Sequence, residues 1–272
     1  IGPRWEMGEA SETKVDENGI QKTLLSHRGG NEPEWQKQEK AHLRLRELGF
    51  NIKMSAYEGG PSGFGFRAKT KEEDLAGEYY GNTYAMGTAI LDAWLNAWKL
   101  GWTYQCYLSF GQGRWWSSHT SMSQGHRPSP GWLAQTLINR HFANQDILKT
   151  EVKNSPLIAI DARTKDEQKK NAPPKAADIP SIYAHASGTD KKISVAVSNL
   201  NLNKACNLEI AVPLKFVSKI TRYYLKGNPH DTNLDDLKVT VAEEKIDTKN
   251  FIDGVLKFKA EPGKASILVF EK

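Results

Sequence analysis

The sequence predicts two parts of different fold class: a parallel α/β segment over residues 1–152 and an antiparallel β-sandwich over residues 153–272. Two observations separate them. All eight tryptophans lie in the first part, where helical and strand-like spacing alternate over short connections, which is typical of parallel α/β units. The second part consists of short apolar runs separated by Gly, Asn and Pro, which is typical of a sandwich.

In the first part, the spacing of apolar residues predicts helices over 32–48, 72–100 and 130–142, and strands over 50–57 and 102–110. Asn31 is placed to cap the first of these helices, and Gly49 and Gly101 come directly after the ends of the first two. Helices and strands that alternate in this way indicate strands that run parallel to one another.

In the second part, apolar runs predict strands over 181–186, 193–199, 208–212, 220–225, 255–258 and 265–270. The stretch 164–178 contains adjacent lysines and adjacent prolines, so we expect a long solvated loop there.

Composition narrows the class of protein. The 272 residues carry a formal net charge of +5, and the lysine-rich stretch 165–175 lacks any accompanying nucleic-acid motif. No apolar run approaches the roughly 20 residues of a membrane helix. Cys106 and Cys206 lie in different segments and indicate small buried residues rather than a metal site. We therefore expect no metal, organic cofactor, nucleic-acid partner or membrane span.

The strand over 50–57 ends in Glu58-Gly59-Gly60-Pro61. In parallel α/β barrels the working residues lie at the C-terminal ends of strands. The two glycines would let the backbone pass close to a ligand, and Pro61 fixes the exit of the chain. Glycoside hydrolysis uses two carboxylates across the scissile bond. Glu58 is predicted to be one of them, the alternative being a glutamate with a local structural role.

Aromatic side chains come after the second strand, at Trp115 and Trp116, with two serines and His119 beyond them. Flat aromatic faces stack on the C–H faces of sugars, and hydroxyl or imidazole groups bind the polar edges. One of the two tryptophans is predicted to lie in a sugar-binding site, the alternative for either of them being a place in the core. His119 and His126 are further candidates.

The segment Ala-Tyr-Glu-Gly-Gly-Pro at 56–61 resembles the strand-seven nucleophile segment of clan A glycoside hydrolases. The helix from about residue 82, the strand over 102–110 and the tail runs 194–199 and 264–270 are similar to the later elements of those enzymes. The resemblance covers roughly residues 30–272. It implies the C-terminal portion of a (β/α)8 barrel and then an accessory β-sandwich. It also implies a retaining hydrolase acting on a poly- or oligosaccharide, with Glu58 as nucleophile and Tyr57 and Trp115 or Trp116 binding substrate.

The acid/base glutamate of such enzymes comes after strand four, in an Asn-Glu pair. Asn31-Glu32-Pro33 has this appearance, but Glu32 precedes Glu58 by only 26 residues, whereas about 90 are expected from the size of a barrel unit. We therefore interpret Glu32 as an acidic residue in the first turn of its helix, near the positive end of the helix dipole.

Two strands cannot close an eight-stranded barrel. A second polypeptide or a cleaved N-terminal fragment is therefore expected to complete it, and a chain that begins at Ile1 is expected to be processed or partial. The alternative function is that of a non-catalytic carbohydrate-binding or surface-assembly subunit with a degenerate barrel. Either function favours a secreted, periplasmic or cell-surface location.

Overall fold

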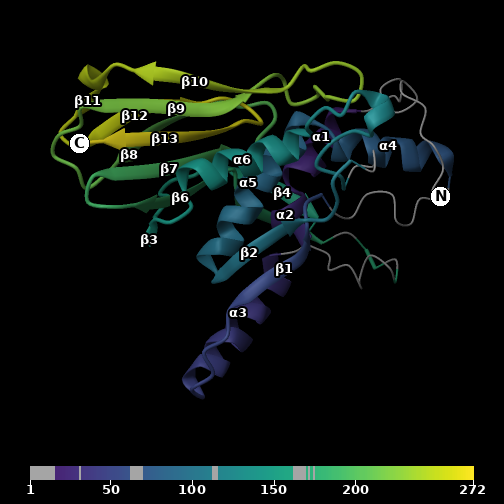
Figure 1. Cartoon of the computed structure of the whole chain (residues 1–272), viewed down its shortest axis with the longest axis horizontal. Coiled ribbons are helices and arrows are strands. Elements are labelled where there is room, and N and C mark those ends of the chain that lie inside the picture. Colours follow the sequence, from purple (N-terminus) through teal and green to yellow (C-terminus); the bar gives the residue numbers. More distant parts are fainter. Residues whose placement is uncertain are drawn as a thin grey trace.

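A computed structural model describes residues 16–30, 32–61, 70–111, 116–161, 170, 172–173 and 175–272 of the chain. Within these ranges the helices and the 3₁₀ turns precede or flank a large antiparallel sheet, as Figure 1 shows. The α-helices are α1 (Glu17–Leu24), α2 (Ser26–Gly30), α3 (Glu32–Glu47), α4 (Lys71–Gly81), α5 (Tyr84–Lys99) and α6 (Pro130–His141). None of the described helices has the length and hydropathy that a membrane span requires.

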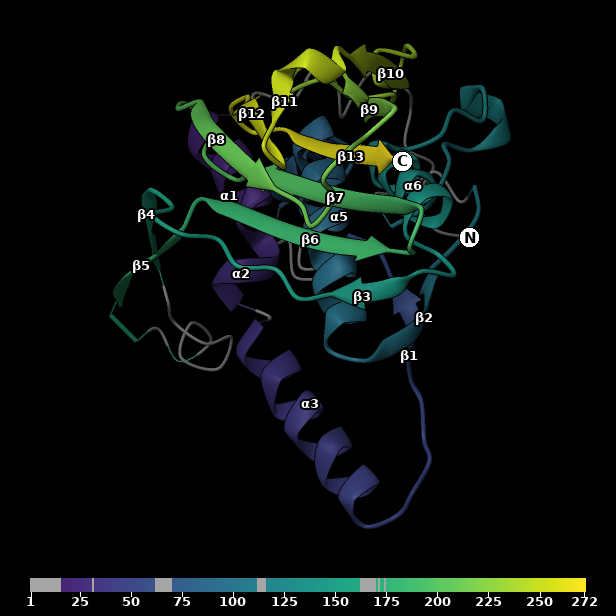
Figure 2. The same cartoon turned by 90° about the vertical axis from the view of Figure 1, so that its left-hand side faces the viewer.

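The parallel α/β part is built on two strands, β1 (Met54–Gly59) and β2 (Trp102–Tyr107), which pair in parallel. The predicted parallel direction is confirmed, and both strands are shorter than expected. Helix α3, which precedes β1, extends away from the rest of the protein (Figures 1 and 2). Among the described residues, β1 and β2 form a sheet of two strands that is not closed.

The single helix expected over 72–100 is wrong, because α4 ends at Gly81 and α5 begins at Tyr84. Thr83 has extended backbone angles, and its hydroxyl accepts a hydrogen bond from the amide of Met86 at 3.3 Å. A threonine in this position caps the second helix. The spacing of apolar residues is helical on both sides of the cap, so periodicity alone predicts one continuous helix.

The second part forms antiparallel sheets, as predicted, and two of them make the sandwich; a strand over 146–148, from the end of the first part, joins the larger one. One has six strands in the order β10-β9-β13-β7-β6-β3, and the other has three in the order β11-β12-β8. Their bounds are β3 (Asp146–Leu148), β6 (Ile182–Gly188), β7 (Lys192–Asn199), β8 (Cys206–Ala211), β9 (Lys219–Lys226), β10 (Thr240–Ile246), β11 (Phe251–Ile252), β12 (Val255–Ala260) and β13 (Ala265–Glu271). Buried residues of both sheets, among them Val195, Ile210, Leu256 and Leu268, share one core, so the sheets form a sandwich.

A second core lies on the other face of the six-stranded sheet. Leu91 and Leu95 of α5 and Leu137 of α6 pack there against Ile267 and Val269 of β13. The protein therefore has a layer of helices over a layer of six strands and a layer of three (Figure 2). The domain boundary at residues 152 and 153 stays a prediction.

Several elements that the structure contains were not predicted from the sequence. Helix α1 begins after Asp16, whose carboxylate accepts a hydrogen bond from the amide of Gly19 at 2.6 Å. Strands β4 (Leu157–Asp161) and β5 (Ala176–Pro180) pair as a separate antiparallel ribbon, so the end of the expected loop over 164–178 is a strand. Within β3 three residues pair with β6.

Candidate functional site

Glu58 lies at the C-terminal end of β1, where the pairing between β1 and β2 is irregular. Between two neighbouring pairs, β1 has the residues Tyr57 and Glu58, whereas β2 has only Cys106. An extra residue of this kind forms a β-bulge, which re-aims side chains and is common beside active sites. Both residues of the bulge are exposed, Tyr57 by 86%. The bulge therefore presents a carboxylate and a phenol together at the end of the strand.

Two glycines after the carboxylate bring the chain close to β2. A Cβ atom on Gly59 would lie 2.8 Å from the carbonyl oxygen of Cys106. Gly60 has a φ of +114°, and a Cβ atom there would lie 3.3 Å from the ring of Tyr107. Glycine is required at both positions for contact with β2, which differs from the close approach to a ligand that the sequence suggested.

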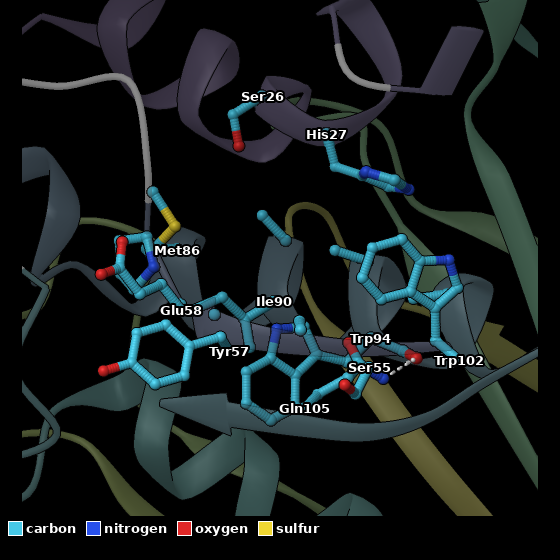
Figure 3. A pocket seen from close by; sticks show the side chains of 17 residues that line it. Ser26, His27, Ser55, Tyr57, Glu58, Met86, Ile90, Trp94, Trp102 and Gln105 are labelled. Carbon is cyan, nitrogen blue, oxygen red and sulfur yellow. Dashed lines mark hydrogen bonds between the residues drawn. The ribbon is translucent and has the colours of Figure 1, made fainter. Parts of the chain in front are cut away.

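A cavity of about 420 Å³ lies beside Glu58, between β1, α2 and α5. Figure 3 shows Tyr57 and Glu58 on one side of it and Ser26 and His27 of α2 across from them. Apolar side chains form much of the remaining wall: Met86, Ala89, Ile90, Ala93, Trp94, Ala97 and Trp102. Of the described residues that line the cavity, Glu58 is the only carboxylate. An apolar pocket with a few polar groups is typical of a small-molecule site.

The structure divides the residues that the sequence grouped as one site. Tyr57 and Glu58 lie together at the cavity, whereas His119 lies in a different cluster beyond the end of β2. Trp116 is partly buried, and Trp115 lies outside the described residues. The substrate-binding roles of these residues stay predictions.

His119 belongs to an aromatic cluster after β2. Its ring stacks on the ring of His126 with centroids 4.7 Å apart, and the ring of Phe110 lies 4.9 Å from each of them. The ring of Trp132 of α6 lies 5.9 Å from that of His119. Burial, together with the charge that His126 can carry, lowers the pKa of His119, so this imidazole is neutral at neutral pH. Sequence reasoning did not place Phe110 in this cluster.

A buried ion pair joins α2 to α5 and to the sandwich. Arg28 donates two hydrogen bonds to the carboxylate of Asp92, at 2.7 and 2.8 Å, and Nε2 of His185 lies 3.0 Å from the same carboxylate. We call Arg28, Asp92 and His185 the buried clasp, because none is more than 6% exposed. Burial opposes the ionisation of Asp92, yet the Arg28 charge and the His185 contact hold the pKa of Asp92 well below its usual range.

The clasp had one signal in the sequence. Asp92 comes directly after Leu91 and lies within the most apolar of the described helices, where a lone charge would be costly to bury. That signal predicts a partner for Asp92, but it does not say which of the 37 Lys and Arg residues supplies it.

His27 lines the cavity and lies next to the clasp in the chain. Its Nε2 atom lies 3.3 Å from the side-chain amide of Asn96. Burial lowers the pKa of His27 to about 3, and the Arg28 charge acts in the same direction against the attraction of Asp92. The cavity wall opposite Glu58 is therefore a neutral imidazole over the whole physiological range.

Acid is expected to destabilise the protein through His27. Between pH 6.5 and about 3 the unfolded chain takes up a proton at this residue and the folded chain does not, so stability falls as the pH falls. The loss between pH 7 and pH 4 should be about 3 kcal/mol from this residue. Urea unfolding at both pH values should show a smaller loss for His27→Gln than for the wild type. Because burial also lowers the pKa of His141 to about 4, the measurement is the difference between these two proteins, and equal losses would contradict the assignment.

Several solved structures resemble this chain, although no protein-family model and no curated protein matches it. An α-L-arabinofuranosidase from Thermotoga maritima is similar over 96% of this chain and 51% of its own, with 17% identity and a TM-score of 0.61. A GH51 arabinofuranosidase from Xanthomonas axonopodis pv. citri is similar over 99% and 50%, with 12% identity and a TM-score of 0.65. A family 44 xyloglucanase from Paenibacillus polymyxa is similar over 95% and 42%, with 14% identity and a TM-score of 0.51.

The chain spans about half the length of these solved structures. At such identities a structural likeness establishes the fold and leaves the activity open. The similar structures are clan A glycoside hydrolases, which consist of a barrel and a β domain. The chain therefore shares its fold with about half of each of these solved structures.

Proposed function

We propose that this chain carries the nucleophile of a retaining glycoside hydrolase that acts on a poly- or oligosaccharide, and that Glu58 is that nucleophile. The observation that carries the proposal is the position of Glu58. It is an exposed carboxylate in a bulge at the C-terminal end of a parallel strand, beside a cavity, in a fold shared with glycoside hydrolases. Strand ends of this kind hold the working residues of parallel barrels.

In this mechanism an oxygen of Glu58 attacks the anomeric carbon of the sugar. The bond from that carbon to the leaving oxygen breaks, and a second carboxylic acid gives its proton to the leaving oxygen. Water then attacks the anomeric carbon, the same second carboxylate takes a proton from the water, and the ester to Glu58 breaks. The two carboxyl groups of a retaining pair lie about 5–5.5 Å apart.

The second carboxylate is proposed to come from a polypeptide that completes the barrel, either a second chain or a cleaved N-terminal fragment. Several large apolar side chains on α3, β2 and the link between α3 and β1 are exposed: Leu43, Leu45, Leu48, Phe50, Ile52 and Tyr104. An exposed patch of this kind marks an interaction surface. Within the described part of the chain, β1 and β2 pair only with each other, and their outer edges favour the addition of further strands. A secreted, periplasmic or cell-surface location stays a prediction.

The proposal is tested by trapping the covalent intermediate. The protein, purified with any polypeptide that stays bound to it, is incubated with 2-fluoro aryl glycosides of arabinofuranose, xylose and glucose. These sugars are chosen because the similar structures include arabinofuranosidases and a xyloglucanase. Fluorine slows both steps and a good aryl leaving group speeds the first one again, so an adduct should accumulate on the peptide that contains Glu58. An adduct on another carboxylate would contradict the role of Glu58, and hydrolysis with inversion would contradict the retaining mechanism.

The rival function is a carbohydrate-binding or surface-assembly subunit without catalysis. One observation favours it: Glu58 is the only carboxylate among the described residues that line the cavity. Polysaccharide binding by the purified assembly, without release of reducing sugar or formation of an adduct, would establish this function instead.

A further inference from the structure

The aromatic cluster after β2 lies on the same edge of the two-stranded sheet as Glu58. The carbonyl of Gly59 accepts a hydrogen bond from the amide of Leu108 at 2.9 Å, so the bulge and the end of β2 lie side by side. Phe110 comes two residues later, beyond the end of β2, so it lies at most about 7 Å further along. This displacement is comparable to the length of one sugar ring.

A second segment fixes the cluster in place. Ser109 bridges Ser117 in parallel, and their hydroxyl oxygens lie 2.9 Å apart. The amide of Ser118 also donates a hydrogen bond to the carbonyl of Ser109 at 2.9 Å. These contacts bring the next residues of the two segments, Phe110 and His119, close to each other. The arrangement is built by the backbone of two segments, and a stacking surface is thereby preorganised.

Phe110 and His119 offer a ligand two different kinds of contact, one apolar and one polar. The side chain of Phe110 is 66% exposed although its ring contacts two imidazoles, so a large part of its surface is available. His119 Nδ1 lies 2.9 Å from the hydroxyl of Ser118, whereas its Nε2 has no hydrogen-bond partner among the described residues. A neutral imidazole nitrogen can donate to or accept from a sugar hydroxyl, depending on the tautomer.

We infer that Phe110, His119 and His126 form a second sugar-binding subsite, one unit along the oligosaccharide from the sugar at Glu58. The C–H face of the sugar stacks on Phe110, and one of its hydroxyls bonds to His119 Nε2, while His126 supports His119 from behind. The inference rests on the proposed function and extends it, because a subsite of this kind selects an oligosaccharide over a single sugar residue.

The test measures binding in a Glu58→Gln background, so that no substrate is consumed. Calorimetry compares xylohexaose, arabinohexaose and cellohexaose with the matching monosaccharides, using the protein with any polypeptide bound to it. Phe110→Ala should weaken binding of the preferred hexasaccharide about tenfold and that of the monosaccharide less than about twofold. Phe110→Leu keeps the apolar volume but lacks a flat face, so it should lose as much hexasaccharide affinity as Phe110→Ala. Phe110→Tyr keeps a flat ring and should retain most of the affinity.

Phe216, which lies between β8 and β9 and is 70% exposed, provides a matched control. Phe216→Ala should change neither affinity. Unchanged hexasaccharide binding in Phe110→Ala, equal losses for both lengths, or no binding of any hexasaccharide would overturn the subsite. The two proposals fail separately. If oligosaccharide binding depends on Phe110 but the protein has no hydrolytic activity, only the hydrolase proposal is contradicted. If Glu58 catalyses hydrolysis and Phe110→Ala has no effect, only the subsite proposal is contradicted.

Discussion

Replacing Glu58 by Gln should reduce hydrolysis at least about 10³-fold while the protein stays folded. Glutamine has nearly the same shape but is a far weaker nucleophile, and it lacks the negative charge that stabilises a positively charged transition state. Because the side chain is exposed, its change should leave the melting temperature within about 2 °C of the wild type. Initial rates on the glycoside that the wild type hydrolyses, with circular dichroism melting in parallel, measure both effects.

Glu32 supplies the matched control. It is the first residue of α3 and belongs to an Asn-Glu-Pro sequence that has the appearance of an acid/base segment. Glu32→Gln should keep activity within a few-fold of the wild type, because the residue is interpreted as an acid at a helix N-terminus. A loss as large as that of Glu58→Gln would assign catalysis to Glu32, and wild-type activity in Glu58→Gln would remove Glu58 from the mechanism.

The second large effect is expected in the buried clasp. Asp92→Asn leaves the guanidinium of Arg28 buried without a compensating charge, and losses of this kind cost about 3–5 kcal/mol. For a protein of this size the melting temperature should fall by roughly 6–20 °C. Differential scanning calorimetry or a urea titration measures the change.

An exposed ion pair provides the control for this experiment, because it shows what the loss of a charge costs when the pair is not buried. Arg44 and Glu47 lie 3.0 Å apart on α3 with both side chains more than 60% exposed, so Glu47→Gln should cost under about 1 kcal/mol. The double variant Arg28→Met with Asp92→Leu should recover much of the stability, because it removes both charges together. A small effect of Asp92→Asn alone would show that water reaches the clasp.

Much of the fold can be read from periodicity, because long amphipathic elements leave a clear pattern. Helix α6 was expected over 130–142 and occupies Pro130–His141, and β7 was expected over 193–199 and occupies Lys192–Asn199. The break between α4 and α5 is accompanied by the cap of Thr83 and by hydrogen bonds from the amides of Tyr84 and Ala85 to the carbonyls of residues 231 and 229, which a pattern of apolar residues does not contain. Strand β3, of three residues, is too short to have a period.

The candidate site was less predictable than the fold. Position along a strand was sufficient to select Tyr57 and Glu58, since the residues at a strand end can be read directly from the chain order. Whether His119 lies with Tyr57 and Glu58 depends on how two loops are arranged in space. The spacing of residues along the chain does not show this arrangement. The buried clasp is harder still to predict from the sequence, because Arg28, Asp92 and His185 come from three elements far apart in the chain.

The bulge in β1 affects how related sequences should be aligned with this one. Two residues of β1 occupy the length of one residue of β2, so a relative without the bulge has one residue fewer between the same two bridges. An alignment that allows no gap inside this strand would then place its carboxylate opposite Tyr57 or Gly59 rather than Glu58. The direction of this side chain is encoded partly by the number of residues in the strand, and a single-codon deletion there could silence or restore a site without altering any other residue.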